Sequence, residues 1–455
     1  MVHRLPSNAP TKHTAGATDP RATILLPDHV MSFTRRDFLL SAGALASASA
    51  LGPLTSCAQP AESLALHRAR QDDQWSHIRA RFRASPEYIH LAGLLIASHP
   101  MSVGGAIAEH RSGLDENPTL YLGEHRRLEQ DSRQAAAEYM GASAADIALT
   151  DSTTMGIGLV YNGIAVRPDQ EMLFSRQDYY STREALRYKA ARTGANLREI
   201  SLFERAAEAS EDEIVAVIIS AVTPRTRVVA TTWVHSSTGL KFPVRRVADA
   251  LADLNAERSP EDRALLCVDG VHGFGVENFH IRDLGCDFFM AGTHKWIFGP
   301  RGTGILWGRP ESQQAVTPTI PSFNRDGTWG GAMSPGGFKP FEHQWAMGEA
   351  FRFHLEIGKQ NVQQRIYELA TQAKEGFAAM PHVQLYTPLE ERLSSGIVCF
   401  DVRGMHPNQV VQRLLAHNVI ASVTPYSPSH ARVTPGLLNN PEEVDHMLRL
   451  VANMT

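Results

Sequence analysis

Strand-like and helix-like segments alternate along the middle of this 455-residue chain. Short apolar runs of strand length recur, and stretches of helical propensity separate them. The strand candidates are Ile147–Thr150, Glu171–Ser175, Val228–Thr232, Ala264–Val268 and Phe288–Met290, and the helix candidates are Gln130–Met140, Thr182–Thr193, Glu211–Ala221 and Val244–Asn255. This alternation predicts an α/β domain, in which helices cover a mostly parallel sheet and the ligand lies at the carboxyl ends of the strands.

The character of the sequence changes after Trp307. Residues 317–340 are rich in Pro, Gly and Ser, which predicts a long surface loop. Helix candidates then follow at Trp345–Leu355, Asn361–Met380, Asn408–Ala416 and from Pro441, and a strand candidate lies at Gly396–Val402. We therefore expect an N-terminal segment and large domain over residues 75–315, and a connecting loop with a smaller α+β C-terminal domain over residues 316–455.

The first 74 residues differ from the rest of the chain. Residues 1–30 are polar and Pro-rich, which predicts a disordered or untranslated extension and leaves Met1 and Met31 as competing starts. Residues 31–57 resemble a twin-arginine export signal, because Arg35-Arg36 precede a short, weakly apolar run. Residues 58–74 are then a linker. The signal predicts export to the periplasm.

The end of this signal leaves two cleavage sites open. Leu54-Thr55-Ser56-Cys57 matches a lipoprotein cleavage box, which would make Cys57 a lipid-anchored N-terminus. Ala48-Ser49-Ala50 is the competing site, and it would release a soluble protein. No two of the four cysteines form a CxxC pair, so we expect no zinc or redox motif. The net charge of -4 and the lack of a basic stripe argue against nucleic-acid binding.

A lysine among small residues follows the last strand candidate, in the run Ala291-Gly292-Thr293-His294-Lys295. A lysine that forms an imine and then takes up a proton must be partly desolvated, because only the neutral amine reacts. The Gly-rich residues that come next suit such a site. They also suit the simpler alternative of a strand-end lysine followed by a turn.

Polar residues follow two other strand candidates. Asp269 ends an apolar run, and a carboxylate there can keep a pyridine nitrogen protonated. A single Asp at a strand end is, however, more often a helix cap or a metal ligand. Thr153 and Thr154 lie between a strand and a helix candidate, where hydroxyls and backbone N–H groups bind phosphate well. Simple capping of the helix by Ser152 or Thr153 is the alternative.

Taken together, these motifs resemble the class V aminotransferase family, and within it the isopenicillin N epimerase-like and cysteine desulfurase-like branches. The resemblance runs from about Tyr88 to the C-terminus. It implies the type I fold of the PLP-dependent transferases, with a seven-stranded, mostly parallel sheet, and pyridoxal 5′-phosphate (PLP) as cofactor. It makes Lys295 the Schiff-base lysine and Asp269 the partner of the pyridine nitrogen, so these two are the expected catalytic residues.

The resemblance also implies further contacts to the cofactor. His272 would lie near its phenolic oxygen, and Tyr179 would stack on its ring where the family often has His. The phosphate would be held by His294, Thr153 and Thr154.

For the substrate, the resemblance implies that Arg432 binds the α-carboxylate, since a guanidinium can do so bidentately. Ser98 or His99 would approach the substrate. Leu438 and Pro441 depart from the family pattern near Arg432. The Thr328–Gln344 region would complete the site of a partner subunit, which implies a homodimer.

The expected substrate is an amino acid whose α-proton Lys295 removes. Transamination is the first choice of reaction. Epimerisation and C–S lysis are the alternatives, and a PLP-binding protein without catalysis is an alternative of another class. The stretch Ala416–Ala431 contains no cysteine, which disfavours a desulfurase that needs a nucleophilic thiol there.

Overall fold

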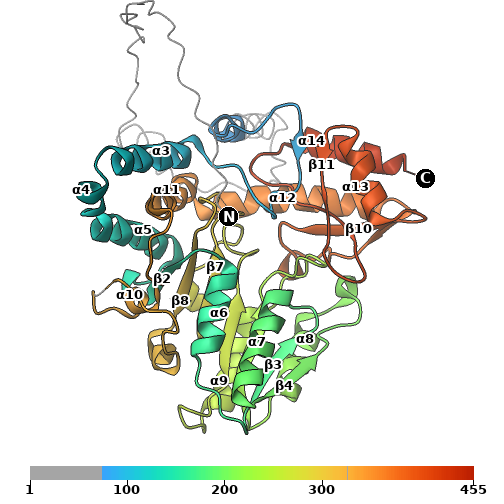
Figure 1. Cartoon of the computed structure of the whole chain (residues 1–455). Helices are drawn as coiled ribbons and strands as arrows, with labels where there is room; N and C mark the ends of the chain where they lie inside the picture. The colour runs from blue at the N-terminus through green and yellow to red at the C-terminus, as the bar shows by residue number, and fades with distance from the viewer. Residues whose placement is uncertain (1–73, 325, 455) are drawn as a thin grey trace, which may run out of the picture. The chain divides into compact units, whose positions relative to one another are not determined.

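A computed structural model describes residues 74–324 and 326–454 of the chain (Figure 1). The predictions for residues 1–30 and 31–57, for the linker up to residue 73 and for Cys57 lie outside the described residues, so export and anchoring stay predictions. Among the helices that the structure does describe, none combines the length and the apolar character needed to cross a membrane.

A seven-stranded sheet forms the centre of the large domain, with the strand order β2-β8-β7-β6-β5-β3-β4. Within it, β8 runs antiparallel to both of its neighbours, and the pairs from β7 to β4 are all parallel. The strands are β2 (Ile147–Thr150), β3 (Glu171–Ser175), β4 (Asn196–Ile200), β5 (Thr226–Thr232), β6 (Leu265–Asp269), β7 (Phe288–Gly292) and β8 (Gly304–Gly308). The predicted α/β fold with a mostly parallel, seven-stranded sheet is confirmed.

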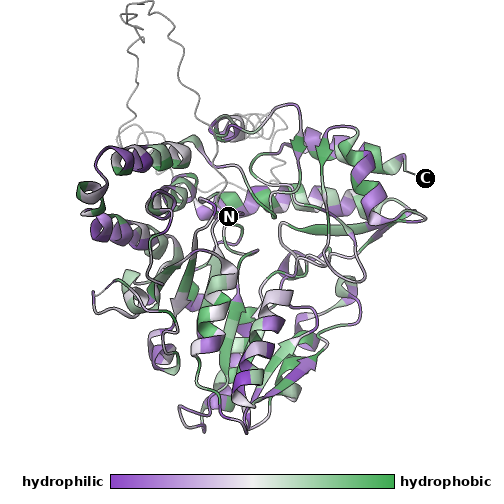
Figure 2. Cartoon of the chain, in the orientation of Figure 1, coloured by the Kyte–Doolittle hydropathy of each residue, from purple (hydrophilic) through white to green (hydrophobic). Residues whose placement is uncertain are grey.

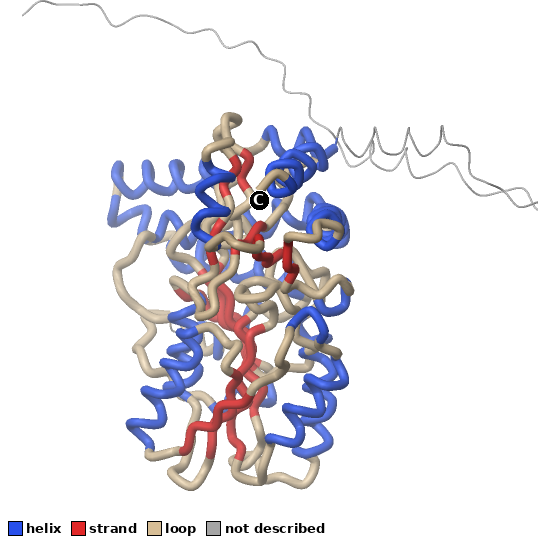
Figure 3. The backbone as a smooth tube through the Cα atoms, turned by 90° about the vertical axis from the view of Figure 1, so that its right-hand side faces the viewer, coloured by secondary structure: helices blue, strands red, loops and turns tan. Residues whose placement is uncertain are grey.

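Helices cover both faces of this sheet, as the edge-on view in Figure 3 shows. Successive strand residues point to opposite faces, so that Val229 packs into one apolar core and Val228 and Ala230 into the other. The first core includes residues of α5, α8, α9 and α11, and the second includes residues of α6 and α7. The helices are α3 (Met101–Glu116), α4 (Pro118–Leu122), α5 (His125–Met140), α6 (Thr153–Gly163), α7 (Tyr180–Thr193), α8 (Glu211–Ala221), α9 (Val244–Asn255), α10 (Trp329–Met333) and α11 (Phe341–Ile357).

The central strands β6 and β7 are mostly apolar, in agreement with burial on both sides, whereas the edge strand β4 is polar and partly exposed (Figure 2). Each residue of β6 and of β7 is buried. The helix ends follow local chemistry. Gly141 ends α5 with a φ of 66°, a left-handed conformation that glycine adopts at little cost, and the Ser210 hydroxyl caps α8 by accepting from the Glu213 N–H.

The C-terminal part of the chain forms a second, smaller layer. Its four-stranded antiparallel sheet has the order β12-β13-β10-β9, and an apolar core joins that sheet to three helices. The elements are α12 (Lys359–Ala378), β9 (Val383–Leu385), β10 (Val398–Val402), α13 (Pro407–Leu415), β12 (Ser422–Val423), β13 (Ala431–Val433) and α14 (Pro441–Ala452). The N-terminal strand β1 (Ile89–His90) pairs in parallel with β11 (Val419–Ile420), which ties the start of the described chain to this smaller layer.

The segment 317–340 differs from the surface loop that its composition predicts. It contains the short helix α10, and Gly330, Gly331 and Met333 of that helix are buried. A Cβ atom added at Gly330 would lie 2.2 Å from the Ile147 carbonyl oxygen, so the helix approaches β2 too closely for a larger residue. Glycine here serves close packing, whereas composition alone suggests a turn.

Candidate functional site

Two adjacent strands bring the predicted catalytic residues to the same edge of the large sheet. Asp269 is the last residue of β6, and it pairs in register with Met290 of β7. Lys295 follows β7 by three residues. Because β6 and β7 are parallel, their carboxyl ends meet at one edge, where an open α/β sheet places its ligand.

Lys295 is partly buried, and its Nζ atom lies 3.3 Å from Nε2 of His272. Burial lowers the pKa of Lys295 to about 8; Asp269 acts to raise it and Arg432 to lower it further. A substantial share of the amine is therefore neutral near pH 8. A neutral, positioned amine is what imine formation and proton removal both require.

Asp269 faces Lys295 across the same space, since each of the two groups shifts the pKa of the other. Burial raises the pKa of Asp269 to about 6, against the lowering effects of the Val271 N–H and of Lys295. The Val271 N–H donates to Oδ1 at 3.2 Å. A carboxylate that is this poorly compensated suits a cationic partner such as a protonated pyridine nitrogen.

The groups around this pair fit the other parts of PLP. Nδ1 of His272 is buried without a hydrogen-bond partner, so it can accept or donate a bond to a ligand oxygen. The Thr153 hydroxyl accepts from the Gly292 N–H at 2.7 Å and keeps its own proton for a phosphate oxygen. Burial, with Lys295 adding to it, lowers the pKa of His294 to about 4, so this ring is neutral at pH 7.

The sequence left two alternatives open at the start of α6, phosphate binding and simple helix capping, and the structure is compatible with both. The Ser152 hydroxyl caps the helix by accepting from the Met155 N–H at 3.1 Å. Thr153 ties the helix to β7, and Thr154 is exposed at the first turn. Capping by Ser152 thus leaves the Thr153 and Thr154 side chains available to a phosphate at the helix N-terminus.

Tyr179 is half-buried and lies directly before α7. Its ring centroid is 4.6 Å from that of Tyr180 and 6.4 Å from that of Tyr426. Burial raises the pKa of Tyr179, and Asp269 and Arg432 also act on that pKa, which places its hydroxyl in the field of the catalytic residues. Stacking of this ring on a planar cofactor stays a prediction.

Arg432 reaches the same space from the small sheet. It lies on β13 and is buried, with Nε donating to the Ser422 hydroxyl at 3.1 Å and Nη1 donating to the Ser236 carbonyl oxygen at 2.7 Å. These two bonds hold the guanidinium and leave further N–H groups for a carboxylate. Arg432 also acts to lower the pKa of Lys295 and of His272, so the guanidinium lies near both groups and favours their neutral forms.

Ser98 lines a cavity of about 500 Å³ together with Lys295. The adjacent His99 does not line this cavity. Its Nδ1 atom lies 3.3 Å from the Phe298 carbonyl oxygen. Of the two residues that sequence left as alternatives, the structure therefore brings Ser98 into the space beside the catalytic lysine.

Sequence reasoning missed Ser236 and Tyr426. The Tyr426 hydroxyl lies 2.8 Å from the Ser236 hydroxyl, and the Ser236 carbonyl accepts from Arg432. Tyr426 belongs to the loop between β12 and β13, a stretch for which the sequence indicated only the lack of a cysteine. One signal was available: Ser236 follows β5 and therefore belongs to the same strand edge as Asp269.

The cysteines of the described chain, Cys267, Cys286 and Cys399, are all free and buried. Cys399 comes nearest, with Sγ 4.0 Å from the Ser236 carbonyl oxygen, and burial raises the pKa of its thiol to about 12. A thiol with this pKa is almost entirely protonated at pH 7 and is a poor nucleophile.

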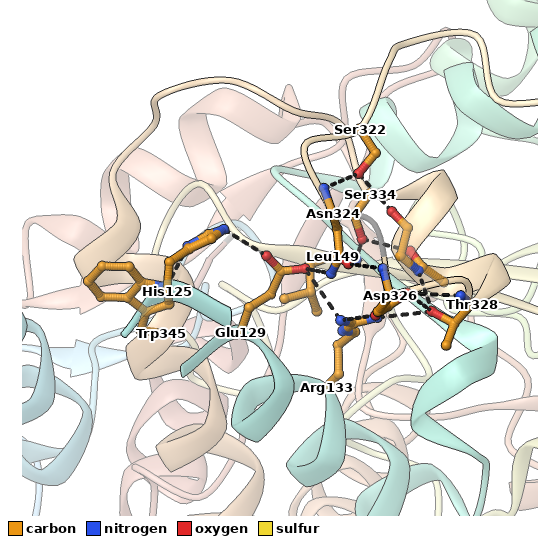
Figure 4. Close-up of polar contacts among 12 residues, drawn as sticks. His125, Glu129, Arg133, Leu149, Ser322, Asn324, Asp326, Thr328, Ser334 and Trp345 are labelled. Carbon is orange, nitrogen blue, oxygen red and sulfur yellow. Dashed lines mark hydrogen bonds and ion pairs between the residues drawn. The ribbon is translucent and has the colours of Figure 1, made fainter. Parts of the chain in front are cut away.

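The segment predicted to serve a partner subunit is anchored on its own chain at its start (Figure 4). The Thr328 hydroxyl donates to Asp326 at 2.6 Å, and Arg133 of α5 donates to the same carboxylate at 2.7 Å. Glu129, one turn before Arg133, accepts from the Asn324 amide at 2.9 Å. These bonds hold the start of the segment in place on α5.

Residues 122–433 match the sequence profile of the aminotransferase class V family. The isopenicillin N epimerase of Streptomyces clavuligerus is 27% identical to this chain, over 72% of the chain and 84% of that relative. A cysteine desulfurase of Klebsiella pneumoniae (strain 342) is also 27% identical, over 79% of this chain and 90% of the relative.

Solved structures show the same fold. A mutant of the protein C-DES, with glycine covalently linked to its PLP cofactor, superimposes with a TM-score of 0.76 at 20% identity, covering 83% of this chain and 99% of that one. The cystine C–S lyase C-DES in complex with cysteine persulfide gives a TM-score of 0.73 at 21% identity, over 80% and 97%.

Proposed function

The chain belongs to the aminotransferase class V family, and from that membership we propose that it is a PLP-dependent aminotransferase acting on an amino acid. PLP is the cofactor of this family and of the structural relative that carries it.

One observation carries the proposal: the Lys295 amine follows β7 at the strand edge where the buried Asp269 ends β6, and the charges of Asp269 and of the buried Arg432 both act on its pKa of about 8. When bound, PLP supplies an electron-accepting ring that stabilises negative charge at the α-carbon of an amino acid. Lys295 would hold the cofactor as a Schiff base, and Asp269 would pair with its ring nitrogen. His294, Thr153 and Thr154 would hold its phosphate, and Tyr179 and His272 its ring.

The chain's own residues would then act on the substrate. Arg432, positioned by Ser236 and Ser422, would fix the α-carboxylate and so direct the α-proton at the Nζ atom of Lys295. The neutral amine would take that proton and return it to the cofactor or to the substrate, and the site of this protonation would determine the product. The partly buried position of Lys295 limits the access of water to the amine.

Transamination fits this set of residues because it needs a single positioned base. Desulfuration through a protein persulfide is disfavoured, since the described cysteines are buried and the nearest has a raised pKa. Epimerisation and C–S lysis are the second candidate. The relatives named isopenicillin N epimerase and cystine C–S lyase support them, and so does Tyr426, a second hydroxyl group in the field of Asp269.

The products separate these reactions. Purified holoenzyme is given a panel of L-amino acids, with and without a 2-oxo acid acceptor. Transamination predicts a new amino acid that forms only with the acceptor present. A D-enantiomer would instead establish epimerisation, and ammonia with a 2-oxo acid formed without acceptor would establish elimination. A cofactor spectrum that responds to no amino acid would favour a PLP-binding protein without catalysis.

A homodimer and export belong to the same proposal. The exposed side chains of Phe323 and Phe338, 65% and 82% accessible, lie in and beside the segment expected to meet a partner subunit. Burying them against a second copy would remove apolar surface from water. Size measurement by light scattering tests the dimer. Fractionation of cells that express the full chain, with Arg35→Lys and Arg36→Lys as the matched variant, tests twin-arginine export, and a Cys57→Ser variant tests the lipid anchor.

A further inference from the structure

A cavity of about 500 Å³ opens directly beside Lys295, at the junction of the large sheet and the small sheet. Three parts of the chain form its walls: the segment that follows β1, the loop between β7 and β8, and the chain around β11 and after β13. The lining residues are Ala84, His90, Ala92, Gly93, Leu95, Ile96, Ala97, Ser98, Lys295, Trp296, Phe298, Arg301, Ile420, Thr434, Gly436, Leu437, Leu438 and Asn439. Its size falls within the range of about 300–1,000 Å³ that is typical of small-molecule sites.

The walls of this cavity are mostly apolar, and two of the apolar side chains are unusually open. Leu95 and Ile96 are 52% and 51% accessible, although both sit between buried neighbours in the chain. Adjacent exposed aliphatic side chains beside a reactive amine are costly unless a ligand covers them. Leu438 adds a further aliphatic side chain to the walls.

Hydrogen bonds hold the walls in place without any ligand. The Ala97 N–H donates to the His294 carbonyl at 3.0 Å, which joins the N-terminal segment to the loop that carries Lys295. The Thr434 N–H and hydroxyl both donate to the Leu91 carbonyl, at 2.8 and 3.0 Å, which joins the same segment to the chain after β13. The cavity is therefore a built feature of the junction.

The position of the cavity relative to the reactive groups indicates what enters it. Lys295 lines the cavity, and Thr434 lies two residues after Arg432. A substrate whose carboxylate is bound at Arg432 and whose α-carbon lies at Lys295 has this space next to its α-carbon. We propose that the cavity receives the substrate side chain and selects amino acids with large, uncharged, apolar side chains. This inference rests on the proposed function, because it places the α-carbon at Lys295.

The charges at the cavity restrict the substrate further. The lining contains the guanidinium of Arg301 and includes no Asp or Glu. A lysine or arginine side chain would therefore enter a site with a cation and no counter-charge, which costs free energy in a partly desolvated space. A small side chain such as that of alanine would leave the apolar walls exposed to water. Large apolar side chains avoid both costs.

The test uses holoenzyme and the exchange of the α-proton in D₂O, followed by NMR for L-alanine, L-leucine, L-phenylalanine and L-lysine. Exchange reports proton removal whichever product forms. Since each methylene in an apolar pocket changes kcat/KM by roughly 10- to 200-fold, we expect phenylalanine and leucine to exceed alanine and lysine by at least about tenfold. Ile96→Asp is expected to lower the ratio of phenylalanine to alanine by at least about tenfold.

Leu415→Asp is the matched control, because Leu415 is 48% accessible but lies on α13, outside the cavity lining. It should leave the ratio unchanged. Exchange that favours alanine or lysine, or an equal loss of selectivity in both variants, would overturn the inference and leave the proposed function standing. No exchange and no spectral response with any amino acid, in protein that retains PLP, would overturn the proposed function itself.

Discussion

The pair Lys295 and Asp269 at the strand ends and the pair Glu129 and Arg133 on α5 are both opposite charges largely removed from water. In the second pair every charge has close partners. Glu129 lies 3.0 Å from His125 and 2.9 Å from Asn324, and Arg133 donates to Asp326 (Figure 4).

The ionisation of the two regions differs accordingly. Burial acts to raise the pKa of Glu129, but bonds from His125 and Asn324 and the charge of Arg133 outweigh it, so this pKa lies below its ordinary value. At the strand ends burial prevails, and it raises the pKa of Asp269 to about 6 while lowering that of Lys295 to about 8. Partnered charges stabilise a fold, whereas charges left underpartnered in a pocket mark a ligand site.

The largest effect is expected from Lys295→Ala. Loss of both the imine-forming group and the base should lower α-proton exchange by about 10⁴-fold. Borohydride reduction followed by mass spectrometry of peptides should trap PLP on Lys295 in the unaltered protein only. Lys189→Ala is the control, because Lys189 is also buried and has a lowered pKa but donates to Asn162 away from the site. A reducible imine in the Lys295→Ala protein would refute the assignment.

Arg133→Met should affect stability most among changes to the α5 pair. Removing one member of a buried ion pair leaves its partners uncompensated, at a cost of about 3–5 kcal/mol in the free energy of unfolding. Urea unfolding followed by circular dichroism measures it. Arg127→Met, on the exposed side of the same helix, should leave the unfolding midpoint unchanged. Equal effects of the two changes would show that the buried network contributes no more to the free energy of unfolding than an exposed ion pair does.

Opposite pH dependences should distinguish the two carboxylates in the apoprotein. The raised pKa of Asp269 means that its stabilising effect is present below about pH 4 and is lost as pH rises through about 6. Asp269→Asn should therefore gain stability relative to the unaltered protein between pH 4 and 7, by up to about 3 kcal/mol.

The contribution of Glu129 to stability changes with pH in the opposite direction. Its lowered pKa means that its stabilising effect is present above about pH 4.5 and is lost as pH falls through the folded-state pKa. Glu129→Gln should then lose stability relative to the unaltered protein as pH rises from this lowered folded-state pKa to about 4.5. Urea midpoints at several pH values measure both variants, and parallel pH profiles would contradict the comparison.

The smallest effect is expected from Tyr426→Phe, which removes one hydroxyl from the strand-end site. Without the bond to Ser236, the carbonyl that holds Arg432 is less well positioned, and binding of a carboxylate should weaken by about three- to tenfold. Spectral titration of holoenzyme with an unreactive carboxylate inhibitor measures it. Tyr188→Phe, at a half-exposed position on α7, is the control. An unchanged affinity for the inhibitor would show that Tyr426 does not contribute to carboxylate binding.

The buried strands and several helices could be predicted from local pattern. Glu171–Ser175, Glu211–Ala221 and Val244–Asn255 have the bounds that their apolar patterns predict, because burial of one face or both faces determines the residue types. The edge strand Asn196–Ile200 was missed. It is partly exposed and polar, so it carries no apolar run that could reveal it.

The meeting of Asp269 and Lys295 was also predictable, because Asp269 ends one buried strand, Lys295 follows the next, and parallel strands end at one edge. Ser236 and Tyr426 were not. They are 190 positions apart and meet only because the loop after β12 lies against the end of β5. Their residue types are ordinary for loops, and nothing in their local sequence indicates that contact.

By itself, the sequence determined which segments are buried, which edge of the sheet carries the reactive side chains and which cofactor those side chains suit. These properties follow from residue periodicity and from the chemistry of lysine, aspartate and arginine. Only the tertiary structure decided that the amine of Lys295 is partly neutral near pH 8, that Glu129 has partners that lower its pKa, and that an apolar cavity adjoins Lys295. Burial and approach between distant segments set ionisation and shape, and no local pattern encodes either.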